Sequence, residues 1–236
     1  AIRGLAAFED EATPGLLLGS YGSFNEEERA DAINTLATRA STAKALLDAV
    51  AKGTIPKRDL NASVARQLQA FGDPKIAARL EEVWGSVRPT SSEKAMLIAK
   101  YKAMITPDRM KSADPSRGRA LFNRTCLQCH KLFDSGGDVG PELTGSDRAN
   151  PDYILENVLD PSATVGRDYR LNTIATTDGR LISGILRDQS DKTLVIQTVN
   201  ERIVLPRDEV DELKPSEASM MPEGALEKLS PEEVRD

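Results

Sequence analysis

The sequence contains very few of the side chains that usually bind metals or react as nucleophiles. Among its 236 residues there are one histidine and two cysteines, and all three lie within residues 126–130. A single histidine excludes iron ligation by two histidines of the same chain. Three ligands also fall short of the four Cys or His residues that a structural zinc site normally uses. Any metal or cofactor chemistry that depends on these residue types must therefore centre on this one stretch.

Aromatic residues and long hydrophobic runs are also scarce. Phe, Trp and Tyr make up 4% of the chain, whereas Ala and Leu recur in amphipathic runs, and this composition favours helices. No apolar run reaches the roughly 20 residues that a membrane-spanning helix needs, so we predict no membrane span in this chain.

The chain lacks any stretch in which basic side chains alternate with aromatics, so we predict that it does not bind nucleic acid. Its net charge of −6 is concentrated at one end. Residues 206–236 hold ten acidic and four basic side chains, whereas residues 1–205 hold 27 of each sign. Such an acidic segment is suited to attract a basic partner over a distance.

Residues 1–106 are predicted to form a HEAT-like array of short helices. Asn25 followed by Glu28 is a capping-box pattern, which marks the start of a helix. Asp73 followed by Pro74 marks another start, because proline is favoured at the first helical position. Since no cluster of catalytic residue types occurs here, we interpret this part as a scaffold or docking surface.

Residues 169–214 are predicted to form a small antiparallel β insertion of four or five strands. The stretch NTIATTDGRLISGILRD alternates in polarity on both sides of Asp178-Gly179, which is the pattern of a β-hairpin. Two further strands are expected around Asn200, and DEVDELK would complete a small barrel or half-barrel. No ligand motif occurs in it, so we interpret it as a structural insertion.

Residues 126–130 read CLQCH, and three chemistries use two cysteines at this spacing. A thioredoxin-like redox pair requires a βαβ setting, whereas the residues before Cys126 are predicted to be helical. A structural zinc site would require a fourth ligand. CxxCH is instead the attachment motif of haem c: the thiols of Cys126 and Cys129 form thioethers with the haem, and His130 becomes an axial iron ligand. We therefore predict one covalently bound haem c.

The residues around this motif resemble those of class I cytochromes c. VGPELTG follows the histidine, and members of that family typically have a Gly-Pro pair after the haem motif. The resemblance implies that the carbonyl oxygen of Pro141 accepts a hydrogen bond from Nδ1 of His130. It also implies that Gly118 and Phe122 lie on a first helix, at the place where the last helix crosses it.

The order of all these segments resembles the planctomycete–verrucomicrobial type of haem-binding domain, from about residue 107 to the end. In order, the matching segments are SRGRALFNRTCLQCH, GPELTG, LDPSATV, YRLNTIATTDGRLISGIL and MMPEGALEKLSPEEVRD. The resemblance implies a mainly α protein in which a cytochrome c fold is interrupted by the β insertion. The proximal half would span 107–168 and the distal half 215–236. It further implies a periplasmic or extracellular protein and the electron-exit domain of a larger dehydrogenase.

The second axial ligand is predicted to be a methionine. Met220 and Met221 lie in an acidic loop without helical periodicity, and a Met-Pro pair before a closing helix resembles the distal ligand of class I cytochromes c. We therefore expect Met221 as the distal ligand, with Met220 as the alternative. Ser230 and Glu233 form a capping box for the closing helix. The remaining methionines, in or just after a predicted helix at 93–105, are expected to pack in the core (Met96, Met104 and Met110).

A haem iron with His and Met ligands has no open position and suits one-electron transfer rather than catalysis at iron. The expected partner is a redox protein or a fused dehydrogenase domain, and the chain is not expected to be an enzyme by itself. One alternative is a haem enzyme or gas sensor with an open or displaceable distal position. A peroxidase normally uses a distal histidine or arginine; the chain has no second histidine, and no pattern in the sequence singles out Arg167 or Arg170 for this role. Another is an interaction scaffold with a structural haem.

Overall fold

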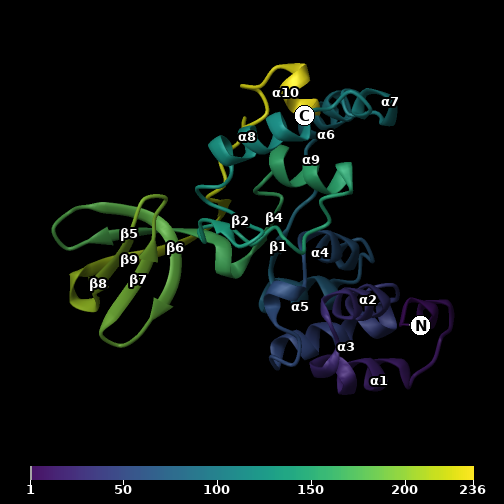
Figure 1. Ribbon diagram of the computed structural model, residues 1–236. Coiled ribbons are helices and arrows are strands. Elements are labelled where there is room, and N and C mark those ends of the chain that lie inside the picture. The colour runs from purple at the N-terminus through teal and green to yellow at the C-terminus, as the bar shows by residue number, and fades with distance from the viewer. Residues whose placement is uncertain (1) are drawn as a thin grey trace. The chain divides into compact units, whose positions relative to one another are not determined.

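The computed structural model describes residues 2–236 and divides them into two compact units (Figure 1). The N-terminal unit ends at Val87, and the C-terminal unit comprises Arg88–Asp236. None of the helices in residues 2–236 combines the length and the apolarity that crossing a membrane requires.

The N-terminal unit is built from short helices. The α-helices are α1 (Thr13–Ser20), α2 (Glu26–Leu36), α3 (Ala40–Ala51), α4 (Ala62–Gln69) and α5 (Pro74–Val83). The 3₁₀ helices are η1 (Ile2–Ala7), η2 (Tyr21–Ser23) and η3 (Lys57–Asp59), and the strand segment β1 (Gly85–Val87) ends the unit. The predicted helices are thus present, and their HEAT-like arrangement stays a prediction.

The helix starts follow the capping signals in the sequence. The Asn25 side chain accepts the N–H of Glu28 at 2.9 Å, and the Glu28 carboxylate accepts the N–H of Asn25 at 3.0 Å. This confirms the capping box at the start of α2. Asp73 likewise caps α5 by accepting the N–H of Lys75 at 2.8 Å.

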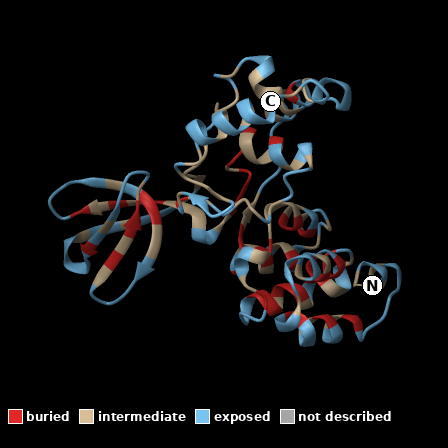
Figure 2. Ribbon diagram, viewed as in Figure 1, coloured by how far each residue is buried: buried red, intermediate tan, exposed pale blue. Residues whose placement is uncertain are grey.

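One hydrophobic core holds the N-terminal unit together, and Figure 2 marks the buried residues of this unit in red along the ribbon. Each α-helix contributes at least one leucine that is no more than 3% exposed (Leu17, Leu36, Leu47, Leu68 and Leu80). Fully burying each of these side chains stabilises the fold by roughly 1.5–3 kcal/mol. The unit therefore has a core of its own, built entirely from residues before Arg88.

The C-terminal unit combines helices with one larger sheet. Its α-helices are α6 (Ser92–Lys102), α7 (Pro107–Met110), α8 (Pro115–Thr125), α9 (Pro151–Leu159) and α10 (Pro231–Arg235). Its strands are β2 (Lys131–Leu132), β3 (Ser135–Gly136), β4 (Thr164–Gly166), β5 (Arg170–Thr176), β6 (Leu181–Gln189), β7 (Thr193–Gln197), β8 (Arg202–Pro206) and β9 (Val210–Ser219). The 3₁₀ helices η4 (Arg167–Tyr169) and η5 (Arg207–Glu209) precede β5 and β9.

The boundary between the units lies after Val87, not at residue 106 as the sequence predicted. The difference arises because α6 packs into the C-terminal unit. Tyr101 of α6 is buried with Leu155 and Leu159 of α9, and further apolar residues of α6, its C-terminal end, the 222–229 segment and α10 cover this cluster. The segment 92–106 therefore belongs with the residues that follow it.

The predicted β insertion forms a five-stranded antiparallel sheet within residues 88–236, in the order β8-β7-β6-β5-β9. Its core contains Ile174, Leu194, Ile196 and Leu205, all nearly inaccessible to solvent. The edge strands β8 and β9 do not pair with each other in this part of the chain, so the sheet is open rather than a closed barrel.

The two ends of this sheet lie next to each other. Arg170, the first residue of β5, is paired with Ser219, the last residue of β9. The sheet therefore leaves the helical part of the unit and returns to it at the same place, as an insertion requires. It also extends to Ser219, beyond the limit of 214 predicted from the sequence.

Candidate functional site

The CxxCH stretch forms a single helical turn at the end of α8. The N–H of Cys129 donates to the carbonyl of Cys126 at 3.1 Å, and the N–H of His130 donates to the same carbonyl at 2.9 Å. Residues at spacings of three and four share one face of a helical turn. The turn therefore presents Cys126, Cys129 and His130 on one side, all of them half-buried.

The His130 ring is held by the loop that follows. Its Nδ1 lies 2.8 Å from the carbonyl oxygen of Pro141, which is the hydrogen bond that the resemblance to class I cytochromes c implies. Because a carbonyl can only accept, Nδ1 carries the hydrogen and Nε2 keeps its lone pair free to bind a metal. Such a hydrogen bond also makes the free nitrogen a stronger donor.

Gly140 lets this loop approach the imidazole closely. A methyl group at this position would lie 2.5 Å from Cε1 of His130, so any other residue would displace the ring or the loop. The N–H of Gly140 also donates to the carbonyl of Cys129 at 2.7 Å, which ties the loop back to the CxxCH turn. Backbone contacts thus surround the histidine on the side of the loop.

A tight hairpin of β2 and β3 connects the turn to this loop. Phe133 and Asp134 at its tip both have positive φ, at 48° and 64°, which is uncommon for residues other than glycine. Gly136 and Gly137 then pass so close to the backbone of residues 128–130 that a Cβ on either would overlap a carbonyl oxygen. The glycine-rich run GGDVG at 136–140 is the sequence signal for these close approaches.

The last helix meets the first helix of the site at Gly118. A Cβ at Gly118 would collide with the backbone of Asp236, so α8 and the end of α10 touch where the resemblance to class I cytochromes c placed their crossing. The Asp236 carboxylate accepts hydrogen bonds from Arg235, Arg117 and the N–H of Asp114. These bonds, that from Arg235 above all, lower the pKa of Asp236 to about 2. The contact therefore combines close backbone packing with a carboxylate that stays ionised.

Met220 and Met221 directly follow β9, and both are half-buried. The N–H of Met221 donates to the Ser219 hydroxyl at 3.1 Å, and the Ser219 N–H donates to the Ser162 hydroxyl at 3.2 Å. This fixes the backbone of the methionine loop but does not distinguish one thioether from the other. The predicted capping box at Ser230 and Glu233 is present and starts α10.

The expectation that the other three methionines pack in the core is wrong for two of them. Met96 is 68% exposed and Met110 is 44% exposed, and neither belongs to the cluster of α6 and α9. Met104 does pack against that cluster.

The Cys129 thiol lacks the lowered pKa of a redox-active cysteine. Burial, and then the neighbouring Cys126, raise the pKa of the Cys129 thiol, whereas a reactive cysteine needs a lowered pKa. The helical residues before Cys126 agree with this interpretation, because a thioredoxin-like pair follows a strand. In residues 2–236 the side chains of His, Cys, Asp and Glu do not gather in groups of three that could enclose a metal ion. The donor set and the glycine-lined histidine fit a planar cofactor attached along one face of the turn.

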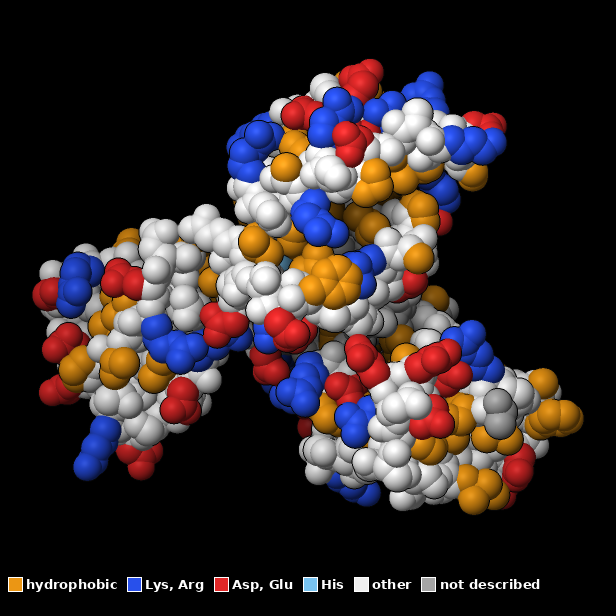
Figure 3. All heavy atoms as spheres, viewed as in Figure 1, with side chains coloured by type: hydrophobic (Ala, Val, Ile, Leu, Met, Phe, Trp, Pro, Cys, Tyr) orange, Lys and Arg blue, Asp and Glu red, His pale blue; other side chains and the backbone are white. Residues whose placement is uncertain are grey.

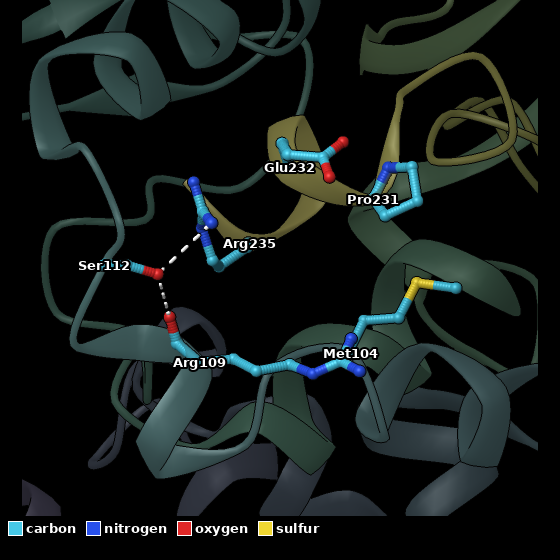
Figure 4. A pocket seen from close by; sticks show the side chains of 6 residues that line it. All are labelled: Met104, Arg109, Ser112, Pro231, Glu232 and Arg235. Carbon is cyan, nitrogen blue, oxygen red and sulfur yellow. Dashed lines mark hydrogen bonds between the residues drawn. The ribbon is translucent and has the colours of Figure 1, made fainter.

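A separate pocket of about 190 Å³ lies between the end of α6, α7 and α10 (Figure 4). Arg235 reaches across it to donate to the Ser112 hydroxyl at 3.2 Å, and that hydroxyl donates to the carbonyl of Arg109. The other lining residues are Met104, Pro231 and Glu232. None of the predicted site residues lines this pocket, and its arginines already have partners or face solvent, so we assign it no ligand.

The acidic charge of residues 206–236 is not gathered on one surface. Residues 206–219 belong to β9 and the residues before it, and residues 220–236 belong to the methionine loop and α10. Each part has five acidic and two basic side chains, so each carries half of the −6. Several acidic groups also pair with cations, among them Glu223 with Lys94 at 2.5 Å. On the face seen in Figure 3, side chains of both signs are interspersed.

Comparison with protein-family models matches residues 113–166 to the family described as "Cytochrome C oxidase, cbb3-type, subunit III". The match covers under a quarter of the chain and spans α8, the CxxCH turn, the His130 loop and α9. A comparison with curated proteins finds no match. The family match and the geometry of the histidine agree on a haem cofactor. Residues 113–166 thus correspond to a cytochrome c-like haem-binding domain, which acts in electron transfer.

Proposed function

We propose that this chain is a c-type cytochrome module that carries one haem and transfers single electrons. Cys126 and Cys129 hold the haem by thioether bonds, His130 is the proximal iron ligand, and Met221 is the distal ligand, with Met220 as the alternative. The observation that carries the proposal is the CxxCH turn in which Pro141 accepts the hydrogen bond from Nδ1 of His130.

When bound, haem supplies an iron that accepts and releases one electron. The protein residues prepare the proximal ligand for this task. The Pro141 carbonyl fixes the tautomer of His130 and directs Nε2 away from the loop, while Gly140 leaves room for the ring. A stronger imidazole donor stabilises the oxidised iron, whereas a methionine thioether favours the reduced iron.

The setting of this module is the electron-exit domain of a larger exported dehydrogenase. Haem c is attached on the exported side of a membrane, so we place the protein in the periplasm or outside the cell. The resemblance to the planctomycete–verrucomicrobial haem-binding domain supports this setting, with the HEAT-like helices before it as a docking surface. The partner is then either a redox protein or a dehydrogenase domain of the same chain.

The decisive experiment is extraction of the purified, coloured protein with acid–acetone. A thioether-bound haem stays with the precipitated protein, and the pyridine haemochrome should give one haem per chain. Cys126→Ala and Cys129→Ala should each keep the pigment through one remaining thioether, and the double variant should release it. If the colour of the wild-type protein leaves with the solvent, covalent attachment is wrong.

The absorbance spectrum of the same protein separates electron transfer from the haem enzyme or gas sensor. Six-coordinate, low-spin iron in both oxidation states supports electron transfer. High-spin iron, or immediate binding of carbon monoxide by the reduced protein, would support an open distal position instead. An interaction scaffold would show a haem that no redox partner reduces or oxidises.

A further inference from the structure

Arg187 of β6 stands at an irregularity of the sheet. In the pairing of β6 with β7, Leu186 is opposite Ile196 and Asp188 is opposite Val195, so Arg187 is the extra residue of a β-bulge. A bulge changes the direction of a side chain relative to a regular strand and often occurs beside a functional site. The side chain of Arg187 therefore does not have to follow the alternation of side chains between the two faces of the sheet.

The Arg187 side chain reaches from the sheet to the loop that holds His130. Its Nη2 donates to the carbonyl oxygen of Asp138 and to that of Val139, the latter at 3.1 Å. The guanidinium also lies over the Tyr169 ring, 5.7 Å from its centre, which restricts its movement. A second arginine, Arg202 of β8, lies 3.6 Å from the Asp138 carboxylate.

The opposite side of the same short loop contacts the histidine. Asp138 and Val139, whose carbonyls Arg187 binds, directly precede Gly140 and Pro141, which contact the His130 ring. Val139 is 5% exposed, so this loop is clamped between the sheet and the imidazole rather than free in solvent. If the carbonyls of Asp138 and Val139 moved, the Pro141 carbonyl that accepts the hydrogen bond of His130 would move with them, because it lies two residues further along the same loop.

Arg187 is also a costly residue for the sheet. Its Nε is buried without a hydrogen-bond partner, and a buried donor of this kind destabilises a fold. A residue that served the stability of the sheet alone would not require a guanidinium here, because apolar side chains fill such positions without a buried polar group. What the guanidinium provides, and an apolar side chain would not, is the pair of hydrogen bonds to the carbonyl oxygens of Asp138 and Val139.

We propose that Arg187 is a positioning residue through which the β insertion holds the 138–141 loop against the proximal histidine. The insertion is then more than a structural addition, because it maintains the hydrogen bond between His130 and Pro141. This inference rests on the proposed role of His130 as an axial haem ligand.

The test uses the holo-protein, reduced, with ¹⁵N-labelled histidine. Because His130 is the only histidine, its ring Nδ1–H gives a single signal whose exchange with solvent NMR can follow. Arg187→Met should accelerate this exchange about tenfold, since loss of the guanidinium lets the loop open locally. Arg187→Lys should have a smaller effect, because an ammonium can still donate to one of the carbonyls. Arg180→Met is the matched control: Arg180 precedes the same strand and pairs with Asp178 within the hairpin. It should leave the exchange within about twofold of wild type.

Two results would overturn the proposal. One is exchange of the Nδ1 hydrogen in Arg187→Met within about twofold of the Arg180→Met control. The other is equal acceleration of amides at the centre of the sheet, such as that of Ile196, which would show a general loss of stability. If Arg187→Met does not accumulate with haem, the exchange of the Nδ1 hydrogen in Arg187→Lys is compared with that in Arg180→Lys. Equal exchange rates in these two variants would then overturn the proposal. A wild-type protein without covalent haem would refute the proposed function, whereas a normal haem with an unresponsive Arg187 would refute this inference alone.

Discussion

At the scale of single residues, the proximal side of the site depends on two neighbours in the chain that act through their backbone. Pro141 contributes a carbonyl oxygen to Nδ1 of His130, and Gly140 contributes the absence of a side chain beside the ring. A substitution at Pro141 that preserves the backbone conformation would keep the acceptor. One at Gly140 would not keep the space, since its Cβ would overlap the imidazole. The two positions therefore differ in what they tolerate.

The distal ligand is the other question at this scale. Met221→Ala should remove the methionine–iron charge-transfer band, lower the midpoint potential and open the iron to added imidazole. The reason is that a thioether is a soft, neutral ligand that favours reduced iron, and alanine offers no donor. The absorbance spectrum of the oxidised protein and a redox titration measure these changes.

Met220→Ala is the matched control, because Met220 is the preceding residue and is buried to a similar degree. It should leave the charge-transfer band in place. The opposite pattern would make Met220 the ligand. If neither variant changes the spectrum, the assignment of methionine ligation is wrong.

At the scale of elements, α6 supports the segment that carries the methionines. Lys94 of α6 is 2.5 Å from the carboxylate of Glu223, two residues after Met221, and the hydrogen bond with Glu223 raises the pKa of Lys94. Leu226 of the same segment packs against the cluster of α6 and α9. The sequence predicted this helix as part of the N-terminal array, yet it contacts the segment that follows Met220 and Met221.

Lys94→Met should therefore loosen this loop without removing a ligand. The Glu223 carboxylate is about half exposed, so the ion pair contributes at most about 1 kcal/mol, which corresponds to about a fivefold change in an equilibrium. We expect the affinity of the oxidised protein for imidazole to rise by up to about that factor. Lys100→Met, an exposed position on the same helix, should leave it unchanged. Equal affinities in the two variants would contradict a role of Lys94 in holding the loop.

At the scale of the whole molecule, the chain has two units with separate cores. The helical core of the N-terminal unit contains buried residues from Leu17 to Trp84, whereas the two clusters of the C-terminal unit contain only residues after Arg88. The sole tryptophan, Trp84, is buried and donates to the carbonyl of Leu60 at 2.7 Å, so its fluorescence reports on the N-terminal unit. Haem absorbance would report on the C-terminal unit.

Leu47→Ala should consequently destabilise one unit and spare the other. Leu47 is fully buried, and replacing a buried leucine with alanine costs about 2–5 kcal/mol. The urea concentration at the midpoint of the Trp84 emission change should fall, while the midpoint of the change in Soret absorbance should stay the same. The corresponding core substitution in α9, Leu155→Ala, should move the Soret transition instead. Transitions that remain coincident in both variants would show that the two units unfold as one.

Much of this protein follows from local sequence signals. The capping boxes at Asn25 and Ser230, the Asp178-Gly179 hairpin and the helical CxxCH turn form where the sequence predicts them. All of these depend on residues within a few positions of one another, and their hydrogen bonds close over one turn of chain. The haem cofactor is also predicted from a local signal, because the five residues of the CxxCH motif indicate it and the family match agrees.

Long-range packing decided the rest. The contact of Arg187 with Asp138 and Val139 joins residues 49 and 48 positions apart, and that of Lys94 with Glu223 joins residues 129 apart. No periodicity in a single sequence reports such pairs, since they depend on which faces of distant elements meet. For the same reason the helix at 92–102 belongs to the C-terminal unit and not to the N-terminal array that the sequence predicted: the sequence predicts the helix, but only the tertiary structure shows that Tyr101 packs against α9.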